Sequence, residues 1–290
     1  MAEEPATPLD PAEAFDAVGN EVRIDILGAL GGSGGGPLSF SELRDAVGTS
    51  DSGRFNYHLQ ELTGHFVERG DGGYSLRYPG WKVAYAVLAG TFNERAHMDP
   101  VAVEGECHSC GAAALVAAYE DERFSVRCES CANLVLEVPF PPSAVADRDP
   151  EAVVDAFDRW STSQARLASD GVCPECAGEM VGSVRTDVPD GFDHEALAEF
   201  ACTVCRRHAV MTFGAVAIHH PSVLAFYHRR DESPRRRPYW TVPQVVTDRY
   251  TDVTSTDPWR VRVEFAAAGD VLETELDGTA DVVETTVTER

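Results

Sequence analysis

The sequence predicts an α+β chain built from several small domains. Its 290 residues, 43% of them hydrophobic, are enough for two or three globular cores. Three patterns predict the classes of those cores. Helix-spaced apolar residues precede a hairpin signal in the N-terminal third, eight cysteines occur in Cys-x-x-Cys pairs, and apolar and polar residues alternate near the C-terminal end. We therefore expect a winged helix-turn-helix unit, two metal-binding ribbons and a small C-terminal antiparallel sheet.

The winged helix-turn-helix prediction begins with one long helix. This helix is expected from about Pro11 to Leu30, because proline suits the first turn of a helix. Val18, Val22 and Ile26 supply its apolar stripe.

A helix-turn-helix pair is expected next. Ser39 and Glu42 have the spacing of a capping box, which starts a short helix that Gly48 ends. A second helix is expected from about Asp51 to Thr63. Its inward face is predicted to carry Phe55, Leu59 and Leu62.

A hairpin wing and one more helix complete the predicted unit. Two strand-like runs, His65–Arg69 and Tyr74–Arg77, flank the turn signal at residues 71–73. A helix is then expected over Pro79–Ala96, where large apolar residues recur every three or four positions.

The same residues carry a family resemblance. Residues 15–27, with their Val-Gly…Arg…Ile-Leu order, resemble the first helix of ArsR-type winged-helix regulators, and residues 57–59, 62 and 66–67 resemble the recognition helix and first wing strand of that group. The resemblance implies DNA binding and a homodimer formed through the first helix and the helix after the wing. It does not extend to metal sensing through a Cys-Val-Cys pattern, because no cysteine precedes Cys107.

The outer face of the predicted second helix supplies the candidate DNA contacts. Arginine suits guanine, whereas asparagine and glutamine suit adenine in the major groove. We expect base contacts from the helix and phosphate contacts from the wing and the helix after it. The candidates on the helix are Ser52, Arg54, Asn56, Tyr57 and Gln60, and the candidates for phosphate are Arg69, Arg77 and Lys82. A solvated face in a protein-binding winged helix is the alternative.

The charge of the chain limits how it can bind DNA. Its net charge is −24, and Lys82 is its only lysine. Such a surface is typical of proteins adapted to high salt, where the Debye length falls to about 3 Å at 1 M. In a halophilic protein the acidity does not exclude DNA, but phosphate contacts should be few and local.

Two cysteine quartets give the strongest signal in the sequence. Two residues between paired cysteines let both thiolates face one ion, and two such knuckles complete a tetrahedral four-cysteine site. We therefore expect two structural Zn²⁺ ions per chain. Their ligands are Cys107, Cys110, Cys128 and Cys131 in the first ribbon, and Cys173, Cys176, Cys202 and Cys205 in the second.

Other interpretations of the cysteines are less well supported by the spacing. Disulfides are disfavoured in a reducing cytosol, a redox Cys-x-x-Cys does not need a second knuckle, and an iron–sulfur cluster also uses four thiolates. Four protein ligands leave no open position on zinc, so a catalytic metal is not expected. Small ribbons depend on their metal for folding.

The remaining segments are predicted to support the ribbons. Helices are expected over Pro150–Ser169 and Pro221–His228, and strands over 259–265, 271–276 and 282–287. His219 and His220 are interpreted as structural or surface residues. The arginines at 229, 230 and 235–237 are expected to pair with the chain's own carboxylates rather than with DNA.

These patterns predict a cytoplasmic DNA-binding transcription regulator that is neither an enzyme nor a membrane protein. The alternative is an interaction module of the transcription machinery, since a winged helix followed by a zinc ribbon resembles archaeal general transcription factor E. The expected organisation is a disordered tail over 1–10, the winged helix over 11–98, ribbon 1 over 99–145, a connecting helix over 146–170, ribbon 2 over 171–220, and a helix with strands over 221–290.

Overall fold

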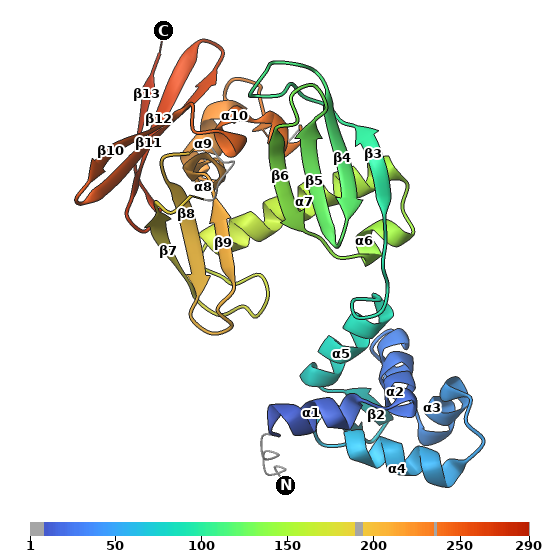
Figure 1. Ribbon diagram of the computed structural model, residues 1–290. Coiled ribbons are helices and arrows are strands. Elements are labelled where there is room, and N and C mark those ends of the chain that lie inside the picture. The colour runs from blue at the N-terminus through green and yellow to red at the C-terminus, as the bar shows by residue number, and fades with distance from the viewer. Residues whose placement is uncertain (1–8, 189–193, 235–236, 290) are drawn as a thin grey trace. The chain divides into compact units, whose positions relative to one another are not determined.

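A computed structural model describes residues 9–188, 194–234 and 237–289 (Figure 1). The tail at residues 1–8 and the arginines at 235 and 236 lie outside the described residues. The chain divides into two compact units. The N-terminal unit comprises Met1–Arg95 with Pro141–Ser143, and the C-terminal unit comprises Ala96–Phe140 with Ala144–Arg290.

The N-terminal unit consists of helices around one two-stranded hairpin. Its elements are α1 (Pro11–Val18), α2 (Glu21–Gly32), α3 (Phe40–Val47), α4 (Ser52–Leu62), β1 (Val67–Gly70), β2 (Gly73–Leu76) and α5 (Tyr78–Leu88). Helix α2 packs against α3, α4 and α5 and occupies the centre of the unit. The fully buried side chains that join them include Ile26, Leu43 and Leu59. These apolar contacts hold α4 against the core along one face only.

The prediction of a single helix over Pro11–Leu30 is wrong. The chain breaks between α1 and α2, because Asn20 adopts an extended conformation and its side chain accepts a hydrogen bond from the Val22 N–H. An asparagine that caps the following helix cannot continue the preceding one. Arg23 then bridges the break by donating to the carbonyl oxygens of Asp16 and Ala17.

The capping signals of α3 and α4 are confirmed. The Ser39 hydroxyl accepts from the Glu42 N–H, and the Glu42 carboxylate accepts from the Ser39 N–H at 2.8 Å. Gly48 ends α3 in the left-handed conformation, with φ of 71°. Asp51 caps α4 by accepting from the Arg54 N–H at 3.0 Å.

The hairpin is confirmed, but the helix after it is shorter than predicted. Strands β1 and β2 pair antiparallel, from Val67 opposite Leu76 to Gly70 opposite Gly73. Helix α5 ends at Leu88 rather than at the predicted Ala96, because the chain turns at Gly90, whose φ is 64°. Left-handed glycine is a common helix terminator.

The C-terminal unit contains three antiparallel sheets and several helices. The first sheet has the order β3-β4-β5-β6, the second β7-β8-β9 and the third β10-β11-β12-β13. The strands are β3 (Met98–Ala102), β4 (Leu115–Glu120), β5 (Arg123–Cys128), β6 (Leu134–Pro139), β7 (Met180–Arg185), β8 (Leu197–Cys202), β9 (His208–Met211), β10 (Thr251–Thr256), β11 (Trp259–Ala267), β12 (Asp270–Asp277) and β13 (Val282–Thr288). The helices are α6 (Ser143–Ala146), α7 (Pro150–Ser169), α8 (Phe213–Ala217), α9 (Pro221–His228), the 3₁₀ helix η2 (Tyr239–Thr241) and α10 (Pro243–Val246).

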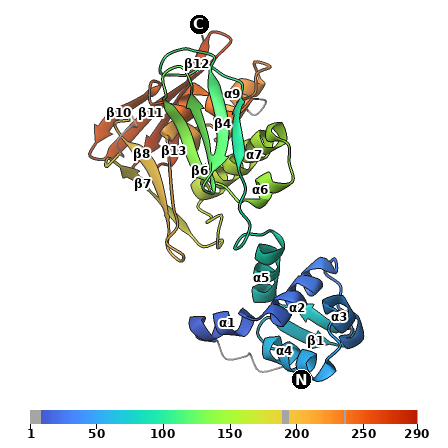
Figure 2. The ribbon, with the colours of Figure 1, turned by 45° about the vertical axis from the view of Figure 1, so that its right-hand side comes forward.

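The first sheet packs on α7 (Figures 1 and 2). The rings of Phe124 and Phe157 stack with centroids 3.8 Å apart. Trp240, from far along the chain, is fully buried in the same core. Its indole N–H donates to the Glu104 carbonyl oxygen at 3.2 Å. The Tyr239 N–H donates to Asp158 at 2.8 Å, so the segment around η2 is tied both to the first sheet and to α7.

The second and third sheets share one core with α8 and α9. Phe200 of β8, Phe226 of α9 and Phe265 of β11 are all buried in it. Gly182 of β7 lies so close to the carbonyl oxygen of Thr279 that an added Cβ would stand 1.9 Å from it. The second cysteine hairpin is therefore built into a larger body with the C-terminal strands.

Candidate metal centres and the exposed face of helix α4

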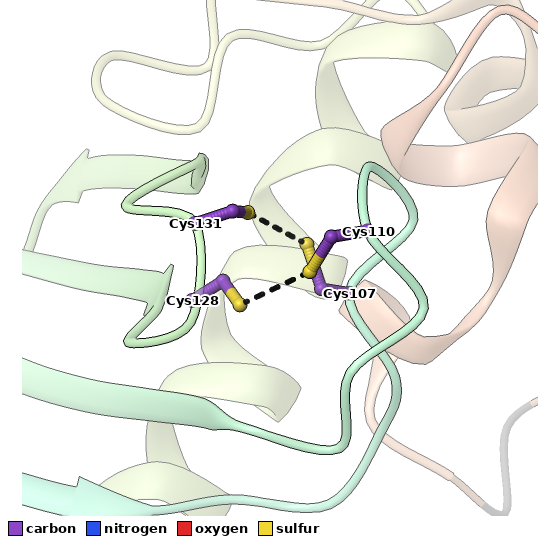
Figure 3. A group of neighbouring side chains, drawn as sticks. All are labelled: Cys107, Cys110, Cys128 and Cys131. Atoms are coloured by element: carbon purple, nitrogen blue, oxygen red, sulfur yellow. Dashed lines mark hydrogen bonds between the residues drawn. The ribbon is translucent and has the colours of Figure 1, made fainter.

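Each cysteine quartet converges on one point. In each quartet the four sulfur atoms lie within 4.8 Å of one another. In the first centre, Cys107 faces Cys131 and Cys110 faces Cys128, with both Sγ–Sγ distances at 3.7 Å (Figure 3). In the second centre the corresponding distances are 3.6 Å, and they join Cys173 to Cys205 and Cys176 to Cys202.

These distances fit a tetrahedral metal site. A metal–sulfur bond of about 2.3 Å in a regular tetrahedron places neighbouring sulfur atoms about 3.8 Å apart. A disulfide would hold two sulfur atoms about 2.0 Å apart instead. The two cysteine quartets can therefore each hold a metal ion such as zinc with little movement of the chain.

The four knuckles share one backbone geometry. In each, the residue after the second cysteine has a left-handed conformation, with φ of 75° at Gly111, 60° at Ala132, 57° at Ala177 and 61° at Arg206. This conformation turns the chain back on itself, so that the first cysteine's N–H donates to a carbonyl five residues on, as from Cys173 to Gly178 at 2.8 Å. Non-glycine residues adopt it at a cost of about 1 kcal/mol or more. Three of the four knuckles accept this cost, which indicates that the fold preserves the sulfur positions.

The second centre also directs backbone N–H groups at its sulfur atoms. Val204 and Cys205 both donate to Cys202 Sγ at 3.4 Å, and Gly178 donates to Cys176 Sγ at 3.4 Å. Burial raises the pKa of the Cys202 thiol, but the N–H groups of Cys205 and Val204 outweigh it and bring the pKa to about 6. At Cys202 the thiolate form that a metal requires is thus favoured, whereas the neighbouring cysteine side chains help to raise the pKa of Cys205.

The candidate DNA contacts lie on solvent-exposed positions of the N-terminal unit. On α4, the buried residues are Phe55, His58, Leu59 and Leu62. The predicted base-contacting residues on the opposite side of α4 are all exposed. They are Ser52, Arg54, Asn56, Tyr57 and Gln60. Helix α4 therefore separates an apolar face from a face of hydrogen-bonding side chains.

The candidate phosphate contacts are also exposed. Arg69 lies on β1 with its guanidinium 5.6 Å from the centre of the Tyr74 ring, Arg77 is the N-cap residue of α5, and Lys82 lies on α5. Within the described part of the chain, none of the three forms an ion pair. Their charges are available to an external anion.

His58 is buried against the core side of α4, where it accepts a hydrogen bond from Arg23 Nε at 3.4 Å. Burial lowers the pKa of His58, and the positive charges of Arg23 and Arg54 lower it further. A neutral imidazole therefore joins α2 to α4 directly behind the exposed face.

The structure shows the contacts of Arg230 and His220 in the C-terminal unit. Arg230 pairs with Asp270, its Nη2 lying 2.6 Å from Oδ2, and its guanidinium lies 4.0 Å from the Phe226 ring centre. Its charge is used internally, as expected. For Arg229 and Arg237 the expectation is wrong, because both are exposed and neither forms an ion pair within the described residues. His220 caps α9, its Nδ1 accepting from the Ser222 N–H at 3.3 Å, which is the structural role predicted for it.

The structure also reveals supporting residues that the sequence did not indicate. His108, inside the first knuckle, places its Nε2 3.0 Å from the Trp240 carbonyl oxygen and so fixes the knuckle to η2. The left-handed alanines were missed as well, since alanine gives no signal for that conformation. No helix among the described residues has both the length and the apolar character to span a membrane.

Two family descriptions match the chain. The family described as "Domain of unknown function (DUF7351)" covers residues 104–282, and the family described as "Domain of unknown function (DUF7347)" covers residues 11–87. The first spans both cysteine quartets and the second spans α1 to α5, apart from the last residue of α5. Neither a curated protein nor a solved structure matches the chain significantly.

Proposed function

We propose that this chain, which belongs to the family described as DUF7351, is a homodimeric, DNA-binding transcription regulator. In this proposal the N-terminal unit is an ArsR-like winged helix-turn-helix. Helix α4 reads bases in the major groove, and residues of the hairpin and α5 hold phosphates. The two four-cysteine centres carry structural zinc in the cytoplasm, where thiols stay reduced.

The observation that carries the proposal is the two-faced character of α4. Four of its residues are buried in the unit's core, whereas Arg54, Asn56 and Gln60 are exposed together. Arginine and the two amides are the side chains that pair with base edges through two hydrogen bonds. The capped N-terminal half of α4, which bears Arg54 and Asn56, is also the half that enters the groove in helix-turn-helix proteins.

Zinc fits both four-cysteine centres through the chemistry of its ligands. Four thiolates at these spacings suit a tetrahedral, borderline-soft cation, and they fill every position around it. Zinc would therefore supply rigidity and folding energy but no open site for a substrate. The proposal includes no catalytic role for either centre.

Dimerisation is supported by large apolar side chains on α1, α5 and the turn after α5. Phe15 is 77% exposed, Tyr78 72%, Tyr85 53%, Leu88 56% and Phe92 76%. Exposed aromatic residues in such number on one small unit are typical of a protein interface. We expect Leu88→Glu to convert a dimer into a monomer in light scattering, with unchanged helix content.

The direct test is DNA binding at high salt. Fragments of the source genome would be selected on the full-length, metal-loaded protein in molar KCl, and the affinity for the best site measured by fluorescence anisotropy. Arg54→Ala and Asn56→Ala should each weaken binding to that site by about 5- to 150-fold, equivalent to about 1–3 kcal/mol. Each should also relax base preference at one position of the site.

The controls separate base reading from general charge. Arg166→Ala removes an exposed arginine of the C-terminal unit and should leave DNA binding unchanged. Lys82→Ala should weaken binding about equally for all sequences and lower the salt dependence by about one unit. Absence of a complex with every genomic fragment would contradict the proposal.

The second candidate function is an interaction module of the transcription machinery. It is favoured by apolar side chains exposed around the second centre, where Val204 is 69% exposed and Val181 49% exposed. In this case the protein would bind a polymerase subunit without reading DNA sequence. Val204→Asp should then abolish capture of that subunit, whereas Asn56→Ala should have no effect.

A further inference from the structure

The C-terminal unit contains a pocket that adjoins the first metal centre, where the ligand Cys107 forms part of its lining, and that extends beyond the centre towards charged side chains the metal does not use. It has a volume of ≈ 570 Å³ and lies between the first knuckle and the segment around η2 and α10. The lining includes Glu104, Glu106, His108, Arg237, Thr241 and Arg249. Figure 3 shows the knuckle loop of Cys107 and Cys110 beside the orange ribbon of the later segment. This size is within the range of small-molecule sites.

The walls of this pocket are held in place by buried contacts. Trp240 lies between Arg237 and Arg249 in sequence and is fully buried. Its indole N–H donates to the Glu104 carbonyl, and its own carbonyl is hydrogen-bonded to His108, so it contacts both ends of the segment 104–108. Gly105, with φ of 122°, lies so close to Thr241 that an added Cβ would stand 2.9 Å from its methyl group. The pocket is thus formed by two segments that cannot separate without exposing the tryptophan.

The charged side chains of the pocket do not neutralise one another. Arg237, Arg249, Glu104 and Glu106 are all exposed. Within the described part of the chain, none of the four takes part in an ion pair. Carboxylates outnumber basic side chains twofold in this chain, with 48 acidic and 24 basic residues. Two arginines that face one pocket and remain unpaired in this setting are available to a bound anion.

We propose that this pocket binds a phosphorylated sugar or nucleotide. Arginine forms two parallel hydrogen bonds with a phosphate, and two arginines can hold one phosphate from two sides. Carboxylates accept hydrogen bonds from hydroxyl and amino groups, which a sugar or a base supplies next to its phosphate. Inorganic phosphate alone would leave most of the volume and both glutamates unused. This site is separate from α4, so the inference does not depend on the proposed DNA binding.

The test is titration calorimetry on the full-length protein with two zinc ions per chain verified. AMP and ribose 5-phosphate are the probes, and adenosine and inorganic phosphate are the comparisons. We expect AMP to bind at least about tenfold more tightly than adenosine, because the charge-assisted contacts to phosphate are lost in adenosine. Glu104→Gln and Glu106→Gln should weaken AMP but not inorganic phosphate.

Charge-removing variants locate the binding site. Arg237→Gln and Arg249→Gln should each weaken AMP by about tenfold or more. Arg148→Gln changes an exposed arginine that lies outside the pocket and both four-cysteine centres, so it is the matched control and should leave the affinity unchanged. Equal affinity in all three variants would overturn the proposal, as would no heat from AMP and ribose 5-phosphate at millimolar concentration. If Arg237→Gln and Arg249→Gln weakened DNA binding and the wild type bound no AMP, the arginines would be assigned to DNA phosphates and the proposal would also fall.

Discussion

The two units use their positive charges in different ways. In the N-terminal unit, Arg44 pairs with Asp45, whereas Arg54, Arg69 and Arg77 are exposed and form no ion pair within the described residues. In the described part of the C-terminal unit, most arginines pair with carboxylates of the same unit, and Arg237 and Arg249 at the proposed pocket are among the exceptions. The paired arginines are Arg123, Arg159, Arg166, Arg185, Arg207, Arg230, Arg260 and Arg262. Carboxylates are abundant throughout the chain. The comparison therefore teaches that unpaired cations, rather than net charge, indicate where an acidic protein can meet an anion.

The largest effect is expected when the proposed zinc ions are removed, because only the C-terminal unit contains the cysteine quartets. Chelation should abolish amide protection across residues 104–282, because each structural zinc contributes about 10–16 kcal/mol in small metal-bound units. Residues 11–87 contain no cysteine and should keep their protection. Hydrogen exchange followed by mass spectrometry on the full chain measures both regions in one sample. Equal loss in the two regions would show that the N-terminal unit depends on the metal too.

An intermediate effect is expected when a paired arginine is compared with an unpaired one. Arg230→Met removes the partner of Asp270 within a half-buried ion pair and should lower the free energy of unfolding by about 1–2 kcal/mol after allowance for solvent screening. Arg54→Met should change it by less than about 0.5 kcal/mol, since it removes no internal contact of that kind. Urea unfolding of both metal-loaded variants at one salt concentration makes the comparison. Similar losses of unfolding free energy in Arg230→Met and Arg54→Met would contradict the view that Arg230 serves an internal contact and Arg54 does not.

The smallest effect concerns pH and the N-terminal unit. The pKa of His58 is lowered in the folded state by burial and by Arg23 and Arg54, so the unfolded state binds the proton more readily. The stabilising contribution of neutral His58 is therefore complete above about pH 6.5 and is lost as pH falls towards the folded-state pKa. When the pH is lowered from 7.5 to 5.5, the melting temperature should fall less for His58→Gln than for the wild type. An equal drop in melting temperature for both proteins would mean that groups other than His58 cause the loss of stability at low pH.

The features predicted correctly from sequence are those encoded by local chemistry. Pro150–Ser169 and Pro221–His228 form α7 and α9 with the predicted ends, because proline at the first turn and a capping side chain before it define the start. The eight cysteines were placed in their two groups because ligand spacing reflects the coordination geometry of one ion.

The features that the sequence concealed depend on distant partners. Strand β3 contains Pro100, which argues against a strand, yet β3 is an edge strand and an edge position tolerates proline. Strand β10 is polar at every position except Val253 and was not recognised, and it too lies at an edge. The position of Trp240 in the core of the first sheet could not be predicted, since nothing near it in sequence shows which of several apolar surfaces it covers.

The location of Trp240 has a consequence during protein synthesis. The four cysteines of the first centre leave the ribosome well before the indole that fills the core beside them, because the chain between Cys131 and Trp240 must be translated first. If the first centre takes up the proposed ion during synthesis, it does so before the aromatic side chain that completes its surroundings has been made. An ion bound at that stage would hold together a hairpin whose core the nascent chain does not yet contain.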